Sequence, residues 1–299
     1  MSDSAARPAE NDSATGPAEP GDVVRRPAEP GDVLRRHAVT ADGLEFQIGT
    51  VAQIGSAIIM YAEPPAGLER EYNRWYEDDH TYAASLAGPG SVAHRRWVAP
   101  ARYKQLRPAA TLFGDPARGS YLIAFWILAG MQEEWYQWLA RQEQVLRDDE
   151  RWEFPKDHIY TGSFTFVSEQ RAPGGPRAIS ALDREFGGMI AVAIERQPGG
   201  ELTGIEQWAE SLRSARLPLS VVLTPLRLFK SVLSAPADPA DDPFALVIFF
   251  CDGEPDQVWL DEVEPRLADV PSIAGATRVG FASPFLSTVP GTDRYVDEL

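Results

Sequence analysis

The chain is poor in several residue types that would assign it to a class. Cys251 is the only cysteine among 299 residues, so no disulfide can form within the chain, as expected in a reducing cytosol. Lysine occurs only at Lys104, Lys156 and Lys230, and the formal net charge at pH 7 is −16. Nucleic acids and anionic membrane surfaces are bound through clustered Lys and Arg. We therefore expect a cytoplasmic protein that binds neither nucleic acid nor a membrane.

Long apolar runs and nucleotide-binding loops are also missing. No run approaches the roughly 18 apolar residues that cross a bilayer, and the acidic amino-terminal residues lack the hydrophobic core of a secretory signal. No Gly-x-Gly-x-x-Gly motif follows a predicted strand and no Walker lysine is present, which argues against dinucleotide and ATP binding. Cys251 lies inside the apolar run 244–251 and is predicted to be a buried thiol rather than a nucleophile.

The first 48 residues differ in composition from the rest of the chain. They are rich in Pro, Ala and Gly, and residues 17–26 and 27–36 within them are nearly identical repeats of ten residues. Two copies are too few for a solenoid, which needs about three. This composition cannot bury enough apolar surface to offset the conformational entropy of the chain. We predict a disordered tail over residues 1–48, with docking to an unidentified partner protein as the alternative.

After the tail, the same order of elements occurs twice. Residues 49–170 and 187–299 each read as strand, helix, strand, strand, helix, strand, and a Pro/Gly-rich linker at 171–186 joins them. This βαββαβ order is the ferredoxin-like plan, in which both helices cover one face of a four-stranded sheet. The predicted strands are 54–62, 92–98, 121–128, 159–167, 189–194, 221–229, 244–251 and 277–285, and the predicted helices are 66–86, 131–148, 204–213 and 257–268.

The second face of each predicted sheet is apolar and has no helix to cover it. Two such sheets packed face to face would cover each other. We therefore predict an α+β fold with tandem ferredoxin-like units that form a dimeric α/β barrel within one chain.

The first predicted helix combines polar, aromatic and titratable side chains on one face. Asn73, Tyr76 and His80 are three or four residues apart, a spacing that brings side chains together on a helix. Histidine is the only side chain that titrates near neutral pH without help from its surroundings. A partly buried structural histidine is the simpler interpretation of His80, and catalysis at the mouth of an aromatic pocket is the functional one.

Four segments of the first unit occur in an order that matches a known family. They are the run 73–76 (Asn-Arg-Trp-Tyr), His80 four residues later, the turn 88–90 (Gly-Pro-Gly) and the strand segment 95–97 (Arg-Arg-Trp). In these features the chain resembles dimeric α/β-barrel proteins of the EthD-like and antibiotic-biosynthesis-monooxygenase-like type, over about residues 54–167.

The sequence departs from that family in two places. Thr81-Tyr82-Ala83-Ala84 stands where family members have a short aliphatic-Pro step. The second unit lacks the motif: when Trp208 is set against Trp75, Arg213 falls where His80 stands. We therefore expect the second unit to be a degenerate copy that closes the barrel, leaving at most one active pocket.

The resemblance implies a small-molecule enzyme but no single reaction, because these folds host monooxygenases without cofactors, cyclases, isomerases, decarboxylases and haem proteins. We expect cofactor-independent acid/base chemistry, namely cyclisation, isomerisation, decarboxylation or oxygenation of an aromatic or polyketide-like carbonyl compound. His80 would be the general base or acid, with Asn73 and Tyr76 orienting the substrate or stabilising an oxyanion. Asp79 would hold the imidazole, or would face water, since neighbouring helical residues point about 100° apart. The predicted substrate-binding residues are Tyr72, Trp75, His94, Arg96 and Trp97.

Other interpretations of the same residues stay open. A non-catalytic ligand-binding or accessory protein of this fold would also need an aromatic pocket, and homo-oligomers are compatible with either role. His80, His94 and His158 together are a candidate metal or haem site. Arg95 and Arg96 are expected to form surface ion pairs, or to bind a carboxylate on the substrate.

Overall fold

The computed structural model describes residues 37–39, 45–47, 52–109, 112–197, 199–226 and 244–299. The repeats at 17–36 lie outside these ranges, as does most of the predicted tail. Within the tail, β1 (His37–Val39) and β2 (Glu45–Gln47) pair as a two-stranded antiparallel ribbon. Among the helices of the described ranges, none combines the length and apolar character needed to cross a membrane.

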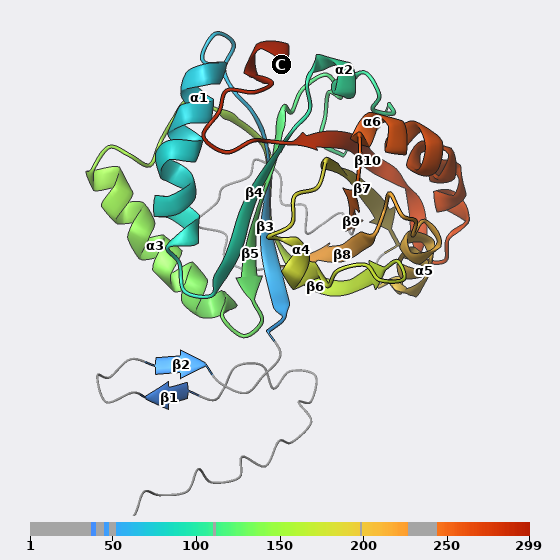
Figure 1. Ribbon diagram of the computed structural model, residues 1–299, viewed down its shortest axis with the longest axis horizontal. Coiled ribbons are helices and arrows are strands. Elements are labelled where there is room, and N and C mark those ends of the chain that lie inside the picture. The colour runs from blue at the N-terminus through green and yellow to red at the C-terminus, as the bar shows by residue number, and fades with distance from the viewer. Residues whose placement is uncertain (1–36, 40–44, 48–51, 110–111, 198, 227–243) are drawn as a thin grey trace, which may run out of the picture.

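Eight strands form one closed antiparallel barrel in the order β10-β4-β5-β3-β6-β8-β9-β7 (Figure 1). Each half of the chain contributes its strands in the order second, third, first, fourth, so the two halves have the same topology. This arrangement confirms the predicted α+β fold with tandem ferredoxin-like units. The strands are β3 (Ile54–Glu63), β4 (Ser91–Val98), β5 (Tyr121–Leu128), β6 (Asp157–Arg171), β7 (Gly188–Arg196), β8 (Leu219–Pro225), β9 (Phe244–Cys251) and β10 (Ala276–Ser287).

The helices lie outside the barrel, one group on each half (Figure 1). The amino-terminal half is covered by α1 and its continuation together with α3, and the carboxy-terminal half by α5 and the helices after α6. The helical segments are α1 (Glu69–Trp75), η1 (Tyr76–His80), η2 (Tyr82–Leu86), α2 (Ala101–Lys104), α3 (Gln132–Asp148), α4 (Ala178–Ala181), α5 (Thr203–Ser211), α6 (Pro255–Val258), η3 (Trp259–Val263), η4 (Glu264–Ser272) and η5 (Val296–Glu298).

Aromatic side chains fill the interior of the barrel. The ring of Tyr61 lies 5.2 Å from that of Phe281 and 5.8 Å from that of Phe113, measured between centroids. Phe113 in turn contacts Tyr160 at 4.8 Å. Arg107 is buried beside these rings and donates hydrogen bonds to three backbone carbonyls and to the Ser283 hydroxyl. The interior is therefore a packed core, as the apolar inner faces of the two sheets require.

The two junctions between the halves differ. At one junction β6 pairs with β8 at seven positions, from Phe164 with Pro225 to Arg171 with Leu219. At the other, β10 pairs with β4 at only two positions, Leu286 with Val98 and Ser287 with Trp97. One junction is thus a long ladder with a single register shift between Phe166 and Ser168, and the other is paired at one end only.

Several predicted element boundaries were wrong. The predicted helix 257–268 is divided into α6, a π-helical turn and the 3-10 helix η4, because Pro265 has no N–H to continue an α-helical bond pattern. The predicted linker 171–186 contains the short helix α4 and the end of β6. The predicted strand 221–229 begins at Leu219, and its last three residues lie outside the described ranges.

Substitution of Gly119 tests how tightly the barrel core is packed. Its φ is +89°, and an added Cβ would lie 1.9 Å from Cζ of Tyr61. Gly114 also has a positive φ, +81°, but no atom lies within 4 Å of its added Cβ. We expect Gly119→Ala to lower the free energy of unfolding by about 3 kcal/mol, from backbone strain plus overpacking. Gly114→Ala should cost only the strain, about 1–2 kcal/mol. Urea unfolding measures both, and equal losses would contradict this account.

Candidate functional site

The predicted motif lies on a helix that contains two π-helical turns. The side chains of Tyr72, Tyr76, His80 and Ala84 are all buried, at 0%, 0%, 6% and 3% exposure. Residues four apart drift by about 40° per step around an α-helix, so a stripe of this length would turn away from the sheet. The π-helical turns η1 and η2 hold more residues per turn and keep the four side chains on the sheet side.

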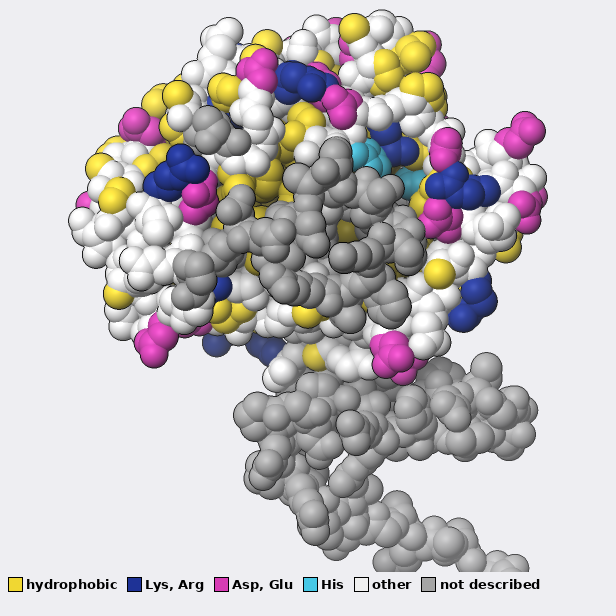
Figure 2. Space-filling view, turned by 180° about the vertical axis from the view of Figure 1, so that it is seen from behind, with side chains coloured by type: hydrophobic (Ala, Val, Ile, Leu, Met, Phe, Trp, Pro, Cys, Tyr) yellow, Lys and Arg dark blue, Asp and Glu magenta, His cyan; other side chains and the backbone are white. Residues whose placement is uncertain are grey.

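His80 lines a cavity of about 630 Å³ between this helix, α3 and the outer face of β3, β5 and β6, which we call the helix-side cavity. Figure 2 shows histidine side chains beside Lys and Arg side chains on this face of the molecule. The walls are mostly apolar and aromatic, with a few polar groups between them. The lining residues are Ile58, Met60, His80, Ala84, Phe125, Leu139, Arg147, Trp152, Glu153, Phe154, Pro155, Lys156 and His158.

The His80 imidazole is held between aromatic rings. It stacks on Trp75 with 4.1 Å between ring centroids and meets the edges of Tyr76 at 5.2 Å and Trp152 at 5.4 Å. Its buried Nδ1 atom has no hydrogen-bond partner. Burial, with smaller contributions from the positive charges of Lys156 and His158, lowers the pKa of His80 from 6.5 to about 3. His80 is therefore neutral at physiological pH.

Two further titratable groups line the same cavity. The buried Nε2 atom of His158 has no hydrogen-bond partner, and burial is the main cause that lowers its pKa to about 4. The Lys156 ammonium lies 4.4 Å above the Trp75 ring, and burial lowers its pKa to about 8. Among the described residues, no carboxylate lies within ion-pair distance of Lys156; the nearby Glu153 pairs with Arg147. The cavity thus combines two neutral imidazoles with a partly buried amine.

Arg96 forms a second polar cluster, on the same face of the sheet but outside the helix-side cavity. Its guanidinium donates to Asn73 Oδ1 at 3.0 Å and to Glu77 Oε1 at 2.9 Å, and it lies over the rings of Tyr76 and Tyr121 at 4.7 and 4.4 Å. The expectation of a surface ion pair was wrong for Arg96, whose side chain is 2% exposed. Strand β4 directs this residue toward the helix, where Glu77 is its counter-ion.

Not all the predicted site residues meet around His80. Trp75 and Tyr76 contact its ring, and Tyr72 packs against both of these residues. Asn73 instead donates to the backbone carbonyl of Thr292 at 2.8 Å and so fastens the carboxy-terminal segment to α1.

The other predicted residues point elsewhere. The Asp79 carboxylate binds Arg151 rather than the imidazole, as the 100° offset between neighbouring helical residues allows. Trp97 faces the barrel side of β4 and contacts Phe250. His94 is stacked between Tyr76 and Phe125, at 5.7 and 4.8 Å.

The sequence interpretation missed most of the cavity wall. Trp152, Phe154 and Lys156 lie in the loop between α3 and β6, with Pro155 among them. A short loop that combines aromatic and basic residues was the available signal, but nothing in the sequence shows that it folds over His80. Within the ranges that the structure describes, no group of three or more His, Cys, Asp or Glu side chains is arranged to hold a metal ion.

Comparison with known proteins gives matches to solved structures alone. No family model and no curated protein matches this sequence. A solved structure of a candidate chlorite dismutase aligns with a TM-score of 0.48 and 9% identity over 83% of this chain and 100% of its own. A candidate monooxygenase from Fusobacterium nucleatum aligns with a TM-score of 0.41 and 9% identity over 78% of this chain and 91% of its own. At these scores the matches carry no argument about the chemistry of this chain.

The low pKa of His80 predicts a dependence of stability on pH. The unfolded chain protonates this residue below about pH 6.5, and the folded chain does so only near about 3. His80 therefore contributes stability that is present above pH 6.5 and lost as the pH falls toward 3. We expect the free energy of unfolding to decrease as the pH is lowered from 6.5 to about 4.5. The decrease should be steeper for the wild type than for His80→Gln, by up to about 1.4 kcal/mol per pH unit.

Urea unfolding at several pH values provides the measurement. His37→Gln, which removes an imidazole from the predicted tail, is the matched control and should follow the wild type. Parallel curves for the wild type and His80→Gln would show that the imidazole has an ordinary pKa in the folded protein.

Proposed function

We propose that the helix-side cavity is an active site for proton transfer next to the carbonyl group of an apolar, aromatic substrate. The observation that carries the proposal is the pair of buried imidazole nitrogens, His80 Nδ1 and His158 Nε2, that lack partners and belong to residues lining one cavity. Leaving a buried polar group unsatisfied costs about 1–3 kcal/mol. A bound molecule that makes hydrogen bonds to these nitrogens would recover that free energy.

The charges of the cavity suit the formation of an enolate. Neutral His80 has a free lone pair to accept a proton from the carbon next to the carbonyl. Its protonated form is unfavourable because of burial and the nearby positive charge of Lys156. An enolate would supply the missing negative charge, so the imidazolium becomes favourable only as the substrate loses its proton. Lys156, above the plane of Trp75, would stabilise the enolate oxygen.

The walls favour a flat substrate. Trp152, Phe154 and Phe125 provide aromatic surfaces, and the aliphatic side chains of Ile58 and Leu139 fill the spaces between them. The burial of His80 strengthens the electrostatic interactions of its imidazole. Proton abstraction next to a carbonyl is the first step shared by several cyclisations and isomerisations. We therefore propose this step and do not choose among the reactions that follow it.

Exchange of carbon-bound hydrogen for deuterium tests the proposal without knowledge of the natural substrate. 2-Tetralone, an aromatic ketone with an acidic methylene group, is the probe, and proton NMR in D2O follows the exchange. We expect the wild type to accelerate exchange and His80→Gln to lose about 10²-fold or more of the acceleration. His37→Gln is the control for loss of one imidazole and should keep the wild-type rate.

The two pKa values predict the pH profile of this exchange. A base with a pKa near 3 is already deprotonated over the ordinary range, so the rate should be flat above about pH 4.5 instead of rising near 6.5. Loss of the Lys156 proton, at about 8, should lower the rate at higher pH. Lys156→Met should remove that upper limb. A profile with its midpoint at 6.5 would assign the base to an ordinary, solvated histidine.

Haem binding is the second candidate, and the unpartnered Nε2 of His158 favours it because an imidazole nitrogen of this kind is an iron ligand. Lys156, which has no carboxylate partner among the described residues, would pair with a propionate. Bound haem would supply redox chemistry that the side chains alone do not have. A Soret band in protein purified from haem-supplied cells, lost in His158→Ala, would favour haem; exchange activity without such a band would favour acid/base chemistry. Binding of 2-tetralone without exchange would indicate a ligand-binding protein.

A further inference from the structure

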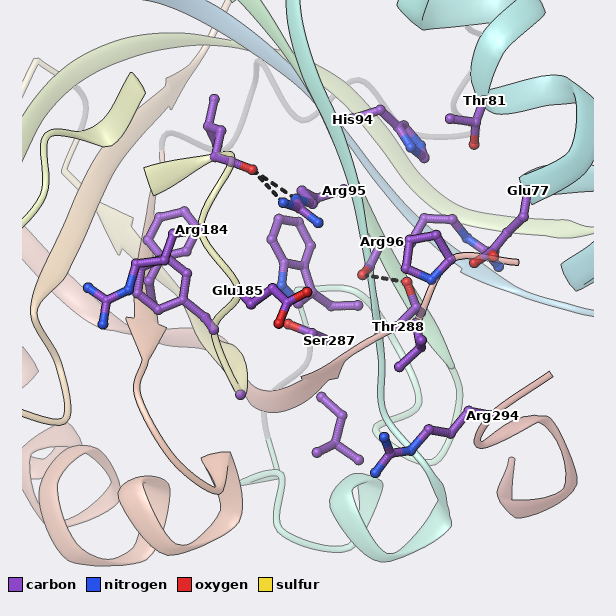
Figure 3. Close-up of a pocket in the computed structure, with 18 of the residues that line it drawn as sticks. Glu77, Thr81, His94, Arg95, Arg96, Arg184, Glu185, Ser287, Thr288 and Arg294 are labelled. Atoms are coloured by element: carbon purple, nitrogen blue, oxygen red, sulfur yellow. Dashed lines mark hydrogen bonds and ion pairs between the residues drawn. The ribbon is translucent and has the colours of Figure 1, made fainter. Parts of the chain in front are cut away.

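The loosely paired junction of the barrel contains a second cavity. It has a volume of about 450 Å³ and lies where β4 and β10 separate, beside the segment that follows α4 (Figure 3). We call it the seam cavity. The β6–β8 junction has seven paired positions against two here, so the cavity occurs where the ladder between the two halves is incomplete.

Buried apolar side chains form one wall of the seam cavity. Trp97, Phe186, Phe250 and Leu286 are between 3% and 8% exposed. The rings of Trp97 and Phe250 are 6.4 Å apart and those of Phe186 and Phe250 are 5.2 Å apart, so the wall is a continuous aromatic surface. This wall favours a molecule with an apolar, preferably aromatic, body.

Arg95 is a cation of this cavity without a counter-ion. Its Nε and Nη2 atoms both donate to the backbone carbonyl of Leu182, at 2.9 and 2.7 Å. Among the described residues, no acidic side chain forms an ion pair with Arg95. By contrast, Arg96 pairs with Glu77, and Arg184 pairs with Asp252 and points away from Arg95 in Figure 3. A guanidinium that is partly buried and lacks an acidic partner is a favourable site for a carboxylate.

We propose that the seam cavity binds an amphipathic carboxylic acid, with its carboxylate on Arg95 and its apolar body on Trp97, Phe186 and Phe250. The formal net charge of −16 repels anions from the surface of the protein. Arg95 inside the cavity attracts a carboxylate at short range, and this attraction is less screened by salt than that of a surface charge. The bound acid would also join the two halves across the junction that the strands leave incomplete.

This site is separate from the helix-side cavity. The stacked rings of Tyr76 and His94 lie between them: His94 lines the seam cavity, and Tyr76 meets the edge of His80. The proposal therefore does not depend on the proposed proton-transfer function.

Two exposed charges at the rim of the seam cavity should have smaller effects. Glu185 faces the centre of the cavity in Figure 3 and would repel a carboxylate, whereas Arg294 lies at the end away from Arg95. Exposed charges contribute little because water screens them. The effect of Glu185 on anion affinity should therefore be opposite in sign to that of Arg95 and smaller.

Isothermal titration calorimetry of the full chain with 1-naphthoate tests the proposal. We expect saturable binding, and at least about tenfold weaker binding of the neutral 1-naphthamide, which has the same ring system but no charge. Arg95→Gln should weaken naphthoate binding by about tenfold or more, while Arg95→Lys should retain part of the affinity. Glu185→Gln should strengthen binding by about two- to threefold.

Further variants locate the bound acid. Arg294→Gln should change the dissociation constant less than Arg95→Gln does, and His80→Gln should leave it unchanged. Arg95 also donates hydrogen bonds to the Leu182 carbonyl, so its substitution could disturb the local structure. The comparison of naphthoate with naphthamide in the wild type avoids this problem, because it needs no variant. The proposal is overturned if the amide binds as tightly as the acid, if His80→Gln weakens binding as Arg95→Gln should, or if no binding occurs at about 1 mM naphthoate.

Discussion

A ferredoxin-like sheet has two apolar faces but helices for only one of them, and this constraint determines the rest of the structure. The chain satisfies it by facing one sheet with a second, so that eight strands close into a barrel. Tyr61, Phe113 and Phe281 then fill the interior at ring separations of 5.2–5.8 Å. Burial of these rings is a favourable contribution to closure.

A filled interior leaves few places for a ligand. The helices contact the outer faces of the sheets through side chains of unequal size, and the hollow at His80 lies in this layer. The second hollow lies at the incomplete junction between β4 and β10. The polar residues of the motif are divided between these regions. His80 lines the first, whereas Arg96 and Glu77 line the second and form a buried ion pair that fastens the helix to β4. One short run of sequence thus supplies both a buried ion pair that holds the helix on the sheet and a histidine that lines a cavity.

Most of the fold could be predicted because its determinants are local. Apolar strands such as 121–128 and 244–251 appear in the structure with the same limits, since each is a continuous apolar run between breakers. The π-helical turns could not be predicted, because they depend on which side chains the sheet buries. The site was predicted in part: His80 is local to its motif, whereas Trp152, Phe154 and His158 reach the cavity through the tertiary path of a loop. The partners of Asp79 and Asn73 depend on residues 72 and 219 positions away.

The unequal junctions have a consequence for how the two halves can change. In a barrel assembled from two identical subunits, every substitution occurs twice, and an opening made at one junction is made at the other. Here the halves belong to one polypeptide, so the ladder of seven pairs between β6 and β8 can be kept while its counterpart, with two, is relaxed. Because the two halves are covalently linked and differ in sequence, an opening at one junction does not require an equal loss of strand pairing at the other.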